Sequence, residues 1–220
     1  MSQSVYVIRA GINCVFVKGE AGSLLIDTGP RNARKNLLRG LEAAGHRAGS
    51  RLTLLLTHGD TDHTGSADFL REEHHAHLAC HKAESPVLAG GDMTRNRKDR
   101  PDRMPWYFRA LLPLGFLFGR GPRIGPDTEL EDGQSLQAFG VEGTVYHLPG
   151  HSRGSLGVLL PTGELACGDL FWNTRRPRLH PLIDDLDQAR ASMERIRQLP
   201  VRTIIPAHGR PFPAELIRSS

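Results

Sequence analysis

The sequence predicts an α/β fold in which two β-sheets are covered by helices on their outer faces. Short β-type segments dominate both halves of the 220-residue chain, and one amphipathic helical pattern follows the strands in each half. The fully apolar run LTLLL at 52–56 is typical of a buried central strand. This order favours two similar layers that share a core, and we expect residues 1–220 to form a single domain.

The first half begins with three predicted strands over 5–9, 14–18 and 23–26. Glycine-containing turns separate them, which indicates an antiparallel meander. Leu37 and Leu41 lie on one face of a predicted helix over 31–44. After the strand at 52–56, a second helix is expected to begin at the end of a polar loop, and another strand covers 77–81.

The middle of the chain, residues 86–126, differs from its surroundings in composition. It is rich in Gly and Pro, contains a basic run over 95–103, and gathers aromatic residues between 106 and 118. Such a stretch is typical of a long functional loop. We therefore expect an insertion that caps a cleft, with the basic run as a solvated loop rather than an anion site.

Short strands resume in the second half. They are predicted over 135–139, 144–148, 155–160 and 165–167, followed by a helix over 184–198 and a last strand over 203–205.

Composition excludes several classes of protein. The net charge of +4 is mild and the basic residues are mostly dispersed, so we expect no nucleic-acid partner. The three cysteines are widely spaced without a CxxC pair, which argues against a disulfide scaffold. We see no signal peptide and no apolar run long enough for a membrane span. A cytoplasmic protein with reduced thiols is expected, and the chain is compatible with a homodimer.

The most informative segment is the loop 57–65, THGDTDHTG, directly after the apolar strand. Within six residues it places four ionisable side chains, His58, Asp60, Asp62 and His63. These groups would repel one another or lose hydration on folding unless a cation held them. A divalent metal site is the simplest such arrangement.

Three more candidate ligands occur later in the chain. His151, Asp169 and His208 each follow a predicted strand, as the 57–65 loop does. Strand ends are stiff enough to hold lone pairs in fixed positions, so we expect these side chains to converge with those of the loop.

With these motifs the chain resembles the metallo-β-lactamase superfamily over nearly its whole length. The resemblance rests on the segments Asn13-Cys14, Leu25-Ile26-Asp27-Thr28-Gly29, His58–His63, Pro149-Gly150-His151-Ser152, Gly168-Asp169 and Ala207-His208-Gly209. It implies a four-layer αββα sandwich with a metal site at one edge of the two sheets.

The resemblance also implies a ligand set for two divalent metal ions. Carried over to this chain, the first ion would have His58, Asp60 and His151. The second would have Asp62, His63 and His208, and Asp169 would bridge the two. Asp27 would orient the loop through hydrogen bonds, and Cys167 is not in a ligand position.

Asp60 departs from the family pattern, which usually has a second histidine at this place. A carboxylate is a harder ligand than an imidazole and adds negative charge. Zinc remains the first expectation, with iron or manganese as alternatives. The departure also leaves open a weakly bound ion or a mononuclear site.

The expected activity is metal-dependent hydrolysis of a small ester-like substrate such as a thioester or lactone. A metal-bound hydroxide would attack the carbonyl, and Asp62 or Asp60 would accept and return a proton. The alternatives are an iron-dependent redox enzyme resembling persulfide dioxygenases, a nuclease or phosphodiesterase, and a binding protein with a vestigial site.

Other histidines are expected to be structural. The group His74, His75, His77 and His81 lies near a predicted helix end and the next strand, and His147 is interpreted as a strand residue.

Overall fold

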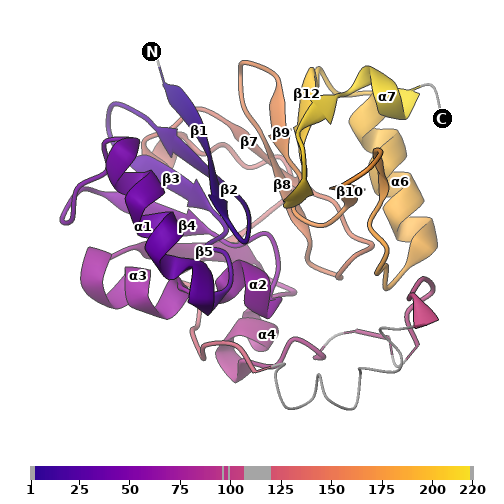
Figure 1. The fold of residues 1–220 in the computed structure, drawn as a ribbon, viewed down its shortest axis with the longest axis horizontal. Coiled ribbons are helices and arrows are strands. Elements are labelled where there is room, and N and C mark those ends of the chain that lie inside the picture. The colour runs from indigo at the N-terminus through magenta and orange to yellow at the C-terminus, as the bar shows by residue number, and fades with distance from the viewer. Residues whose placement is uncertain (1–2, 96, 99, 107–119, 219–220) are drawn as a thin grey trace.

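A computed structural model shows four layers, with two sheets face to face and helices on both outer faces (Figure 1). It describes residues 3–95, 97–98, 100–106 and 120–218. Figure 1 places α1 (Arg34–Ala43) and α3 (Ala67–His74) outside one sheet, and α6 (Leu186–Arg197) outside the other. The predicted αββα sandwich is therefore confirmed.

The first sheet contains six strands in the order β1-β2-β3-β4-β5-β6. Its members are β1 Ser4–Ala10, β2 Ile12–Lys18, β3 Ser23–Ile26, β4 Leu52–Leu55, β5 His77–His81 and β6 Thr128–Leu130. β1 to β3 form the predicted antiparallel meander, whereas β3 to β6 run parallel. The parallel strands deliver their carboxyl ends to one edge of the sheet.

Alternation along the central strands fills two separate cores. In β2, Phe16 packs in the cluster that contains Leu37 and Leu41 of α1, whereas Val15 and Val17 face the second sheet. This sheet is thus buried on both faces. Here the predicted helix over 31–44 consists of a short 3-10 turn, Arg31–Ala33, followed by α1.

The second sheet contains five strands in the order β14-β12-β9-β8-β7. Its members are β7 Thr144–His147, β8 Leu156–Leu159, β9 Glu164–Ala166, β12 Thr203–Ile205 and β14 Phe212–Pro213. Val145 and Val158 face the first sheet, whereas Leu165 and Ile204 pack with Ile196 of α6 on the opposite face. The short helix α7, Glu215–Arg218, follows β14.

A small third sheet contains three short strands from the last quarter of the chain, in the order β11-β10-β13. It pairs β10 (Phe171–Asn173) with both β11 (Arg178–Leu179) and β13 (His208–Gly209). The sequence analysis missed these strands because two of the three are only two residues long. They matter because they set the positions of side chains beside the predicted metal ligands.

One predicted strand is wrong. Residues 137–139 form a 3-10 turn, Gln137–Phe139, and only Ser135 makes an isolated bridge, to Thr144. The buried residues Leu136 and Phe139 lie three positions apart, which is the spacing of a helical turn rather than of a strand.

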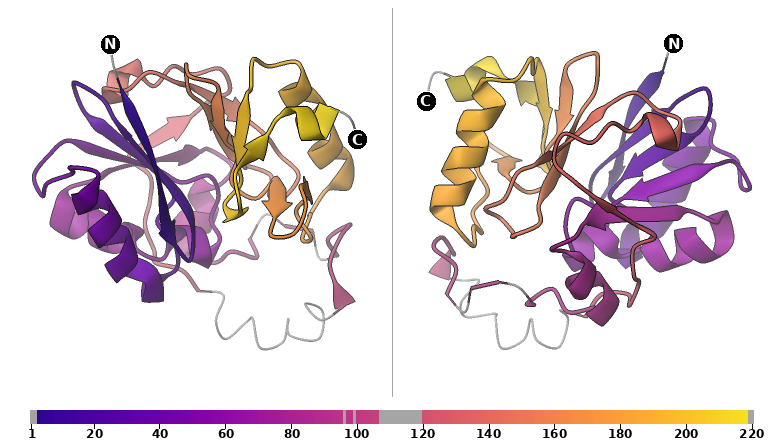
Figure 2. Two further views of the ribbon diagram at one scale, coloured as in Figure 1. Left: turned by 45° about the horizontal axis from the view of Figure 1, so that its top comes forward. Right: turned by 180° about the vertical axis from the view of Figure 1, so that it is seen from behind.

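The segment 86–126 contains more regular structure at its ends than a single loop. The helix α4, Ser85–Gly90, forms its beginning, and β6 follows shortly after its end. Most of the aromatic group, residues 107–118, lies outside the described residues, so the cap over a cleft stays a prediction. In both views of Figure 2, the described parts of this segment lie below the two sheets.

No helix in the described part of the chain is long and apolar enough to cross a membrane.

Candidate metal centre

All seven predicted ligands lie at one edge of the sandwich, on segments that leave parallel or neighbouring strands. His58 follows β4, and the short helix α2, Thr61–Thr64, carries Asp62 and His63. His151 follows β7 and Asp169 follows β9, whereas His208 begins β13 just after β12. The expectation that strand ends converge is therefore met.

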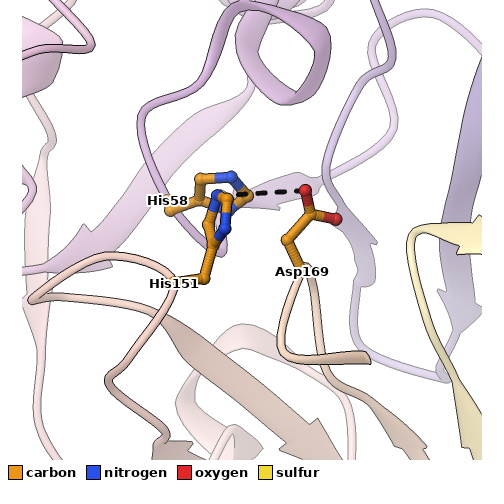
Figure 3. A group of neighbouring side chains, drawn as sticks. All are labelled: His58, His151 and Asp169. Carbon is orange, nitrogen blue, oxygen red and sulfur yellow. Dashed lines mark ion pairs between the residues drawn. The ribbon is translucent and has the colours of Figure 1, made fainter. Parts of the chain in front are cut away.

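The side chains form three overlapping clusters in which all ligand atoms lie within 4.8 Å of one another. The clusters are His58, His151 and Asp169; Asp62, His63 and His208; and Asp169, His180 and His208. Figure 3 shows the first cluster, with His58 and His151 side by side and Asp169 facing them. The dashed contact joins His151 Nε2 to Asp169 Oδ2 at 3.9 Å.

Several buried polar atoms in these clusters have no hydrogen-bond partner among the described residues. They are Nε2 of His58, of His63 and of His180, and Oδ1 of Asp169. An unsatisfied buried polar atom costs about 1–3 kcal/mol. Because these atoms point into one place and are the types that bind divalent ions, the residues fit a bound metal.

Asp27 orients the metal-binding loop, as the family resemblance implied. Its carboxylate accepts hydrogen bonds from the backbone N–H and the hydroxyl of Thr57, at 2.8 and 2.7 Å. The same carboxylate lies 2.8 Å from Nδ1 of His63. When Nδ1–H of His63 donates to Asp27, Nε2 carries the lone pair that a metal ligand needs.

Glu84, which the sequence analysis missed, connects two of the ligand-bearing loops. Its buried carboxylate accepts hydrogen bonds from the backbone N–H groups of Gly59 and Gly154, at 2.9 and 3.0 Å. It also accepts one from the hydroxyl of Ser152 at 2.8 Å. A lone Glu after a strand has no sequence pattern that predicts this role, since its partners lie 25 and 70 residues away.

Asn13 fixes the loop that carries His208. Its side-chain amide donates to the carbonyls of Pro206 and Gly209, both at 2.8 Å. These bonds explain physically why Asn13-Cys14 is part of the family motif.

Asp60 contacts predicted ligands and also a cation from the chain itself. Its Oδ2 lies 3.2 Å from Nε2 of His151 and 3.5 Å from Nε2 of His58. Its Oδ1 accepts a 2.5 Å hydrogen bond from Arg97, which also donates to the backbone carbonyl of His151. Burial opposes ionisation of Asp60, but Arg97 and His58 hold the pKa of its carboxyl well below the usual range.

Arg97 corrects the interpretation of the basic run as a solvated loop. Its side chain is 13% exposed and lies inside the centre, although its neighbour Lys98 is 37% exposed and pairs with surface carboxylates. Because several arginines lie among polar residues within 95–103, the sequence does not indicate which of them is buried.

His180 is a further residue of the centre that the sequence analysis did not single out. It follows β11, is 5% exposed, and its Nε2 lies 3.3 Å from Oδ2 of Asp169. Trp172 of β10 packs against it edge to face and stacks on His208. The ring of His180 is also near that of His151, with centroids 5.0 Å apart.

The carboxylates divide the imidazoles into two electrostatic groups. Burial lowers the pKa of His58, and it lowers that of His180 to about 4. Burial acts in the same direction on His63 and His208, but neighbouring carboxylates outweigh it. Asp27 and Asp169 raise the pKa of His63 well above its usual value, and Asp169 raises that of His208 to about 9.

The remaining predicted structural histidines lie outside the three clusters. His74 contacts His46 at 3.2 Å, and His81 stacks on His147 with ring centroids 4.2 Å apart. The buried thiol of Cys167 lies 3.7 Å from the carbonyl of Ile205 and takes no part in the clusters.

Comparison with known proteins agrees with this geometry. The family model described as the metallo-beta-lactamase superfamily matches residues 7–208. The acyl-coenzyme A thioesterase MBLAC2 of Gallus gallus is 29% identical over 92% of this chain and 74% of its own length. A hydroxyacylglutathione hydrolase of Synechococcus sp. (strain JA-3-3Ab) is 33% identical, over 43% of this chain and 38% of its own length.

Solved structures show the same fold. The metallo-beta-lactamase family protein TTHA1429 from Thermus thermophilus has a TM-score of 0.71 and 22% identity, over 99% of this chain and 77% of that one. TTHA1623, solved in a di-iron-bound form, has a TM-score of 0.69 and 25% identity, over 97% and 96% of the two chains. The matched family model covers the loop 57–65 and all seven predicted ligands. This chain therefore belongs to the metallo-beta-lactamase superfamily.

Proposed function

We propose that this metal-dependent hydrolase acts on small thioesters and uses two divalent ions, zinc in the first place. The observation that carries the proposal is the convergence of buried, unpartnered imidazole and carboxylate atoms at one edge of the sandwich. Such a donor set can hold the divalent ions that metal-dependent hydrolysis requires.

The choice of a thioester rests on the relatives. The MBLAC2 protein of Gallus gallus, named an acyl-coenzyme A thioesterase, aligns with 92% of this chain. The shorter match, a hydroxyacylglutathione hydrolase, also carries the name of a thioester-cleaving enzyme. Lactones and oxygen esters share the reacting carbonyl and are the next substrates to consider.

The ligands would divide between two positions. His58, His151 and Asp169 would hold one ion, with Asp60 beside it, and Asp62, His63 and His208 would hold the other. When bound, the ions would lower the pKa of a coordinated water and polarise the substrate carbonyl.

Asp62 is the better placed of the two carboxylates predicted to transfer protons. Its side chain is 40% exposed, compared with 8% for Asp60, so a substrate can reach it. Burial opposes its ionisation, but His63 and His208 lower the pKa of Asp62, which keeps its carboxylate ionised and able to accept a proton at neutral pH. Asp60, held by Arg97 between His58 and His151, would position those two imidazoles rather than exchange protons.

A substrate panel tests the proposal. Protein stripped with a chelator and then reloaded with zinc, manganese or iron is assayed on acyl thioesters, lactones and phosphodiesters. We expect thioester hydrolysis that is lost on chelation and restored by metal. Hydrolysis of phosphodiesters alone would replace the thioesterase with a phosphodiesterase, and oxygen uptake by the iron form on a persulfide would replace it with a redox enzyme.

A further inference from the structure

The small third sheet places His180 next to Asp169. β10 pairs antiparallel with β11, with Phe171 opposite Leu179, and the backbone N–H of His180 donates to the carbonyl of Leu170 at 3.1 Å. The next residue towards the N-terminus is Asp169. On its other side β10 pairs with β13, with Trp172 opposite His208. His180 and His208 therefore flank the strand that follows Asp169.

The free nitrogen of His180 is buried and has no hydrogen-bond partner among the described residues. Nε2 lies 3.3 Å from Oδ2 of Asp169, but the two atoms do not meet hydrogen-bond geometry. Oδ2 of Asp169 is also 3.5 Å from Nε2 of His208, and the three ligand atoms lie within 4.8 Å of one another. This spacing leaves room for an ion between them and uses no residue of the 57–65 loop.

The other nitrogen of His180 is held by the group that holds His151. Nδ1 of His180 lies 3.0 Å from the carbonyl oxygen of Leu182 and 3.2 Å from the backbone nitrogen of the same residue, and Nδ1 of His151 lies 2.8 Å from that oxygen. A carbonyl oxygen has two lone pairs and can accept both N–H groups. In the tautomer with the proton on Nδ1, each imidazole directs an unprotonated Nε2 into the centre, which is how metal-ligating histidines are usually supported. A bound metal would select this tautomer of His180 over the one whose Nδ1 accepts from the backbone N–H of Leu182.

We propose that His180 is a metal ligand, and that Asp169, His180 and His208 form a binding position for a divalent ion of the zinc, cobalt, iron or manganese class. The proposal rests on the metal centre of the proposed function, but not on a thioester as the substrate.

The shared residue His208 limits how the positions are filled. Because Nε2 of one imidazole binds one ion, an ion held by His180 and His208 excludes one held by Asp62, His63 and His208. Two ions at most then occupy the three clusters through these residues. His180 would add to the affinity for the ion bound by His208, because that ion could be held by Asp169 and His180 as an alternative to Asp62 and His63.

Metal titration of the His180→Gln variant tests this directly. Glutamine keeps an amide that can bond to Leu182 but lacks an imidazole. Metal-free wild-type and variant protein are titrated with zinc in competition with a chromophoric chelator. We expect the affinity for one of the ions to fall at least about tenfold. The matched control is His46→Gln, which removes a buried histidine that also has an unpartnered nitrogen but lies outside the three clusters.

A spectroscopic count separates a ligand from a packing residue. In the cobalt-loaded protein, each bound histidine whose Nδ1–H is hydrogen-bonded contributes one exchangeable proton signal shifted by the paramagnetic ion. His180→Gln should lose one such signal, and His46→Gln should lose none. Unchanged zinc affinity, or lower affinity with every shifted signal retained, would overturn the proposal. Neither outcome of this experiment depends on thioester hydrolysis by the wild-type protein. If the wild-type protein proved to have no thioesterase activity, the comparison of zinc affinities and cobalt-shifted signals would still decide whether His180 is a metal ligand.

Discussion

The two sides of the metal centre differ in how their charges are balanced. On the His208 side, two imidazoles lie among Asp27, Asp62 and Asp169, and carboxylates raise the pKa of both His63 and His208. On the other side, burial lowers the pKa of His58, and the nearest carboxylate, Asp60, already pairs with Arg97. The carboxylates of the His208 side attract a cation, whereas the His58 side already contains the guanidinium of Arg97.

In the proposed two-ion centre, this difference predicts that the two ions bind with unequal affinity. A guanidinium whose terminal nitrogen lies 3.4 Å from Nε2 of His151 repels an incoming divalent ion. The presence of Asp60 in place of the usual histidine is therefore coupled to Arg97, since a histidine at position 60 would leave the buried arginine without a carboxylate partner. We expect the His208 side to bind its ion first.

The largest effect is expected from removing the one carboxylate that both sides share. Asp169→Ala should lower thioester turnover at least about a thousandfold, equivalent to about 4 kcal/mol. It should also lower the bound metal from two ions to at most one, because Asp169 belongs to two of the three clusters. Turnover and metal content by mass spectrometry check this. Asp187→Ala, whose side chain is 94% exposed, is the control, and a fully metallated, active Asp169→Ala protein would contradict the shared role.

Removing the internal cation should make the two sides more alike. Arg97→Met leaves Asp60 as an unpaired buried carboxylate, which should destabilise the metal-free protein by about 3 kcal/mol. Saturating zinc should recover most of that loss, since an ion can then replace the guanidinium beside Asp60. Denaturant unfolding with and without zinc measures both effects.

The control for Arg97 is Arg34→Met, which breaks a partly exposed ion pair with Asp68 and should cost below about 1 kcal/mol. Equal losses in the two variants, with no recovery on adding zinc, would show that Asp60 and Arg97 do not determine the difference between the sides.

Glu84 tests how far the two loops of the His58 side depend on one carboxylate. Glu84→Gln puts an amide NH2 group where an oxygen accepts from a backbone N–H, and should cost about 2 kcal/mol of unfolding free energy. Zinc binding on that side should weaken in parallel. Glu129→Gln, which alters an exposed acceptor of Ser85, should be near neutral; a similar loss there would mean that Glu84 has no special bracing role.

The pH dependence of the metal-free protein should be dominated by the His208 side. A histidine whose folded pKa is raised stabilises the fold below its unfolded pKa, and that contribution is lost as pH rises towards about 9 for His208. Between pH 6.5 and 8 the loss should approach about 2 kcal/mol per raised histidine. His58 and His180, whose pKa values are lowered, are neutral in the fold throughout this window but still titrate in the unfolded chain, so each adds an opposing rise in stability of at most about 0.4 kcal/mol.

Unfolding at several pH values, in wild-type and His208→Gln protein, measures that slope. The variant should lose the part of the slope that comes from His208. Stability that rises from pH 6.5 to 8 would contradict the assignment of charge to this side.

Much of this arrangement could be predicted from the sequence, because strand exits and family motifs are local patterns. The convergence of the candidate ligands at one edge, the hydrogen bonds of Asp27 to the loop and the two-sheet sandwich all follow from segments of a few residues. Arg97 and Glu84 could not be predicted, since their partners lie 25 to 70 residues away and each sits among ordinary polar neighbours. His180 was missed because the two-residue strand before it carries no periodic signal.

Zinc titration of metal-free wild-type protein beside Arg97→Met tests the central claim most directly. We predict two wild-type dissociation constants that differ by at least about tenfold, and a smaller ratio in the variant because its weaker position improves. Two equal sites in the wild type, or an unchanged ratio in Arg97→Met, would show that Arg97 does not make the two positions of the metal centre unequal.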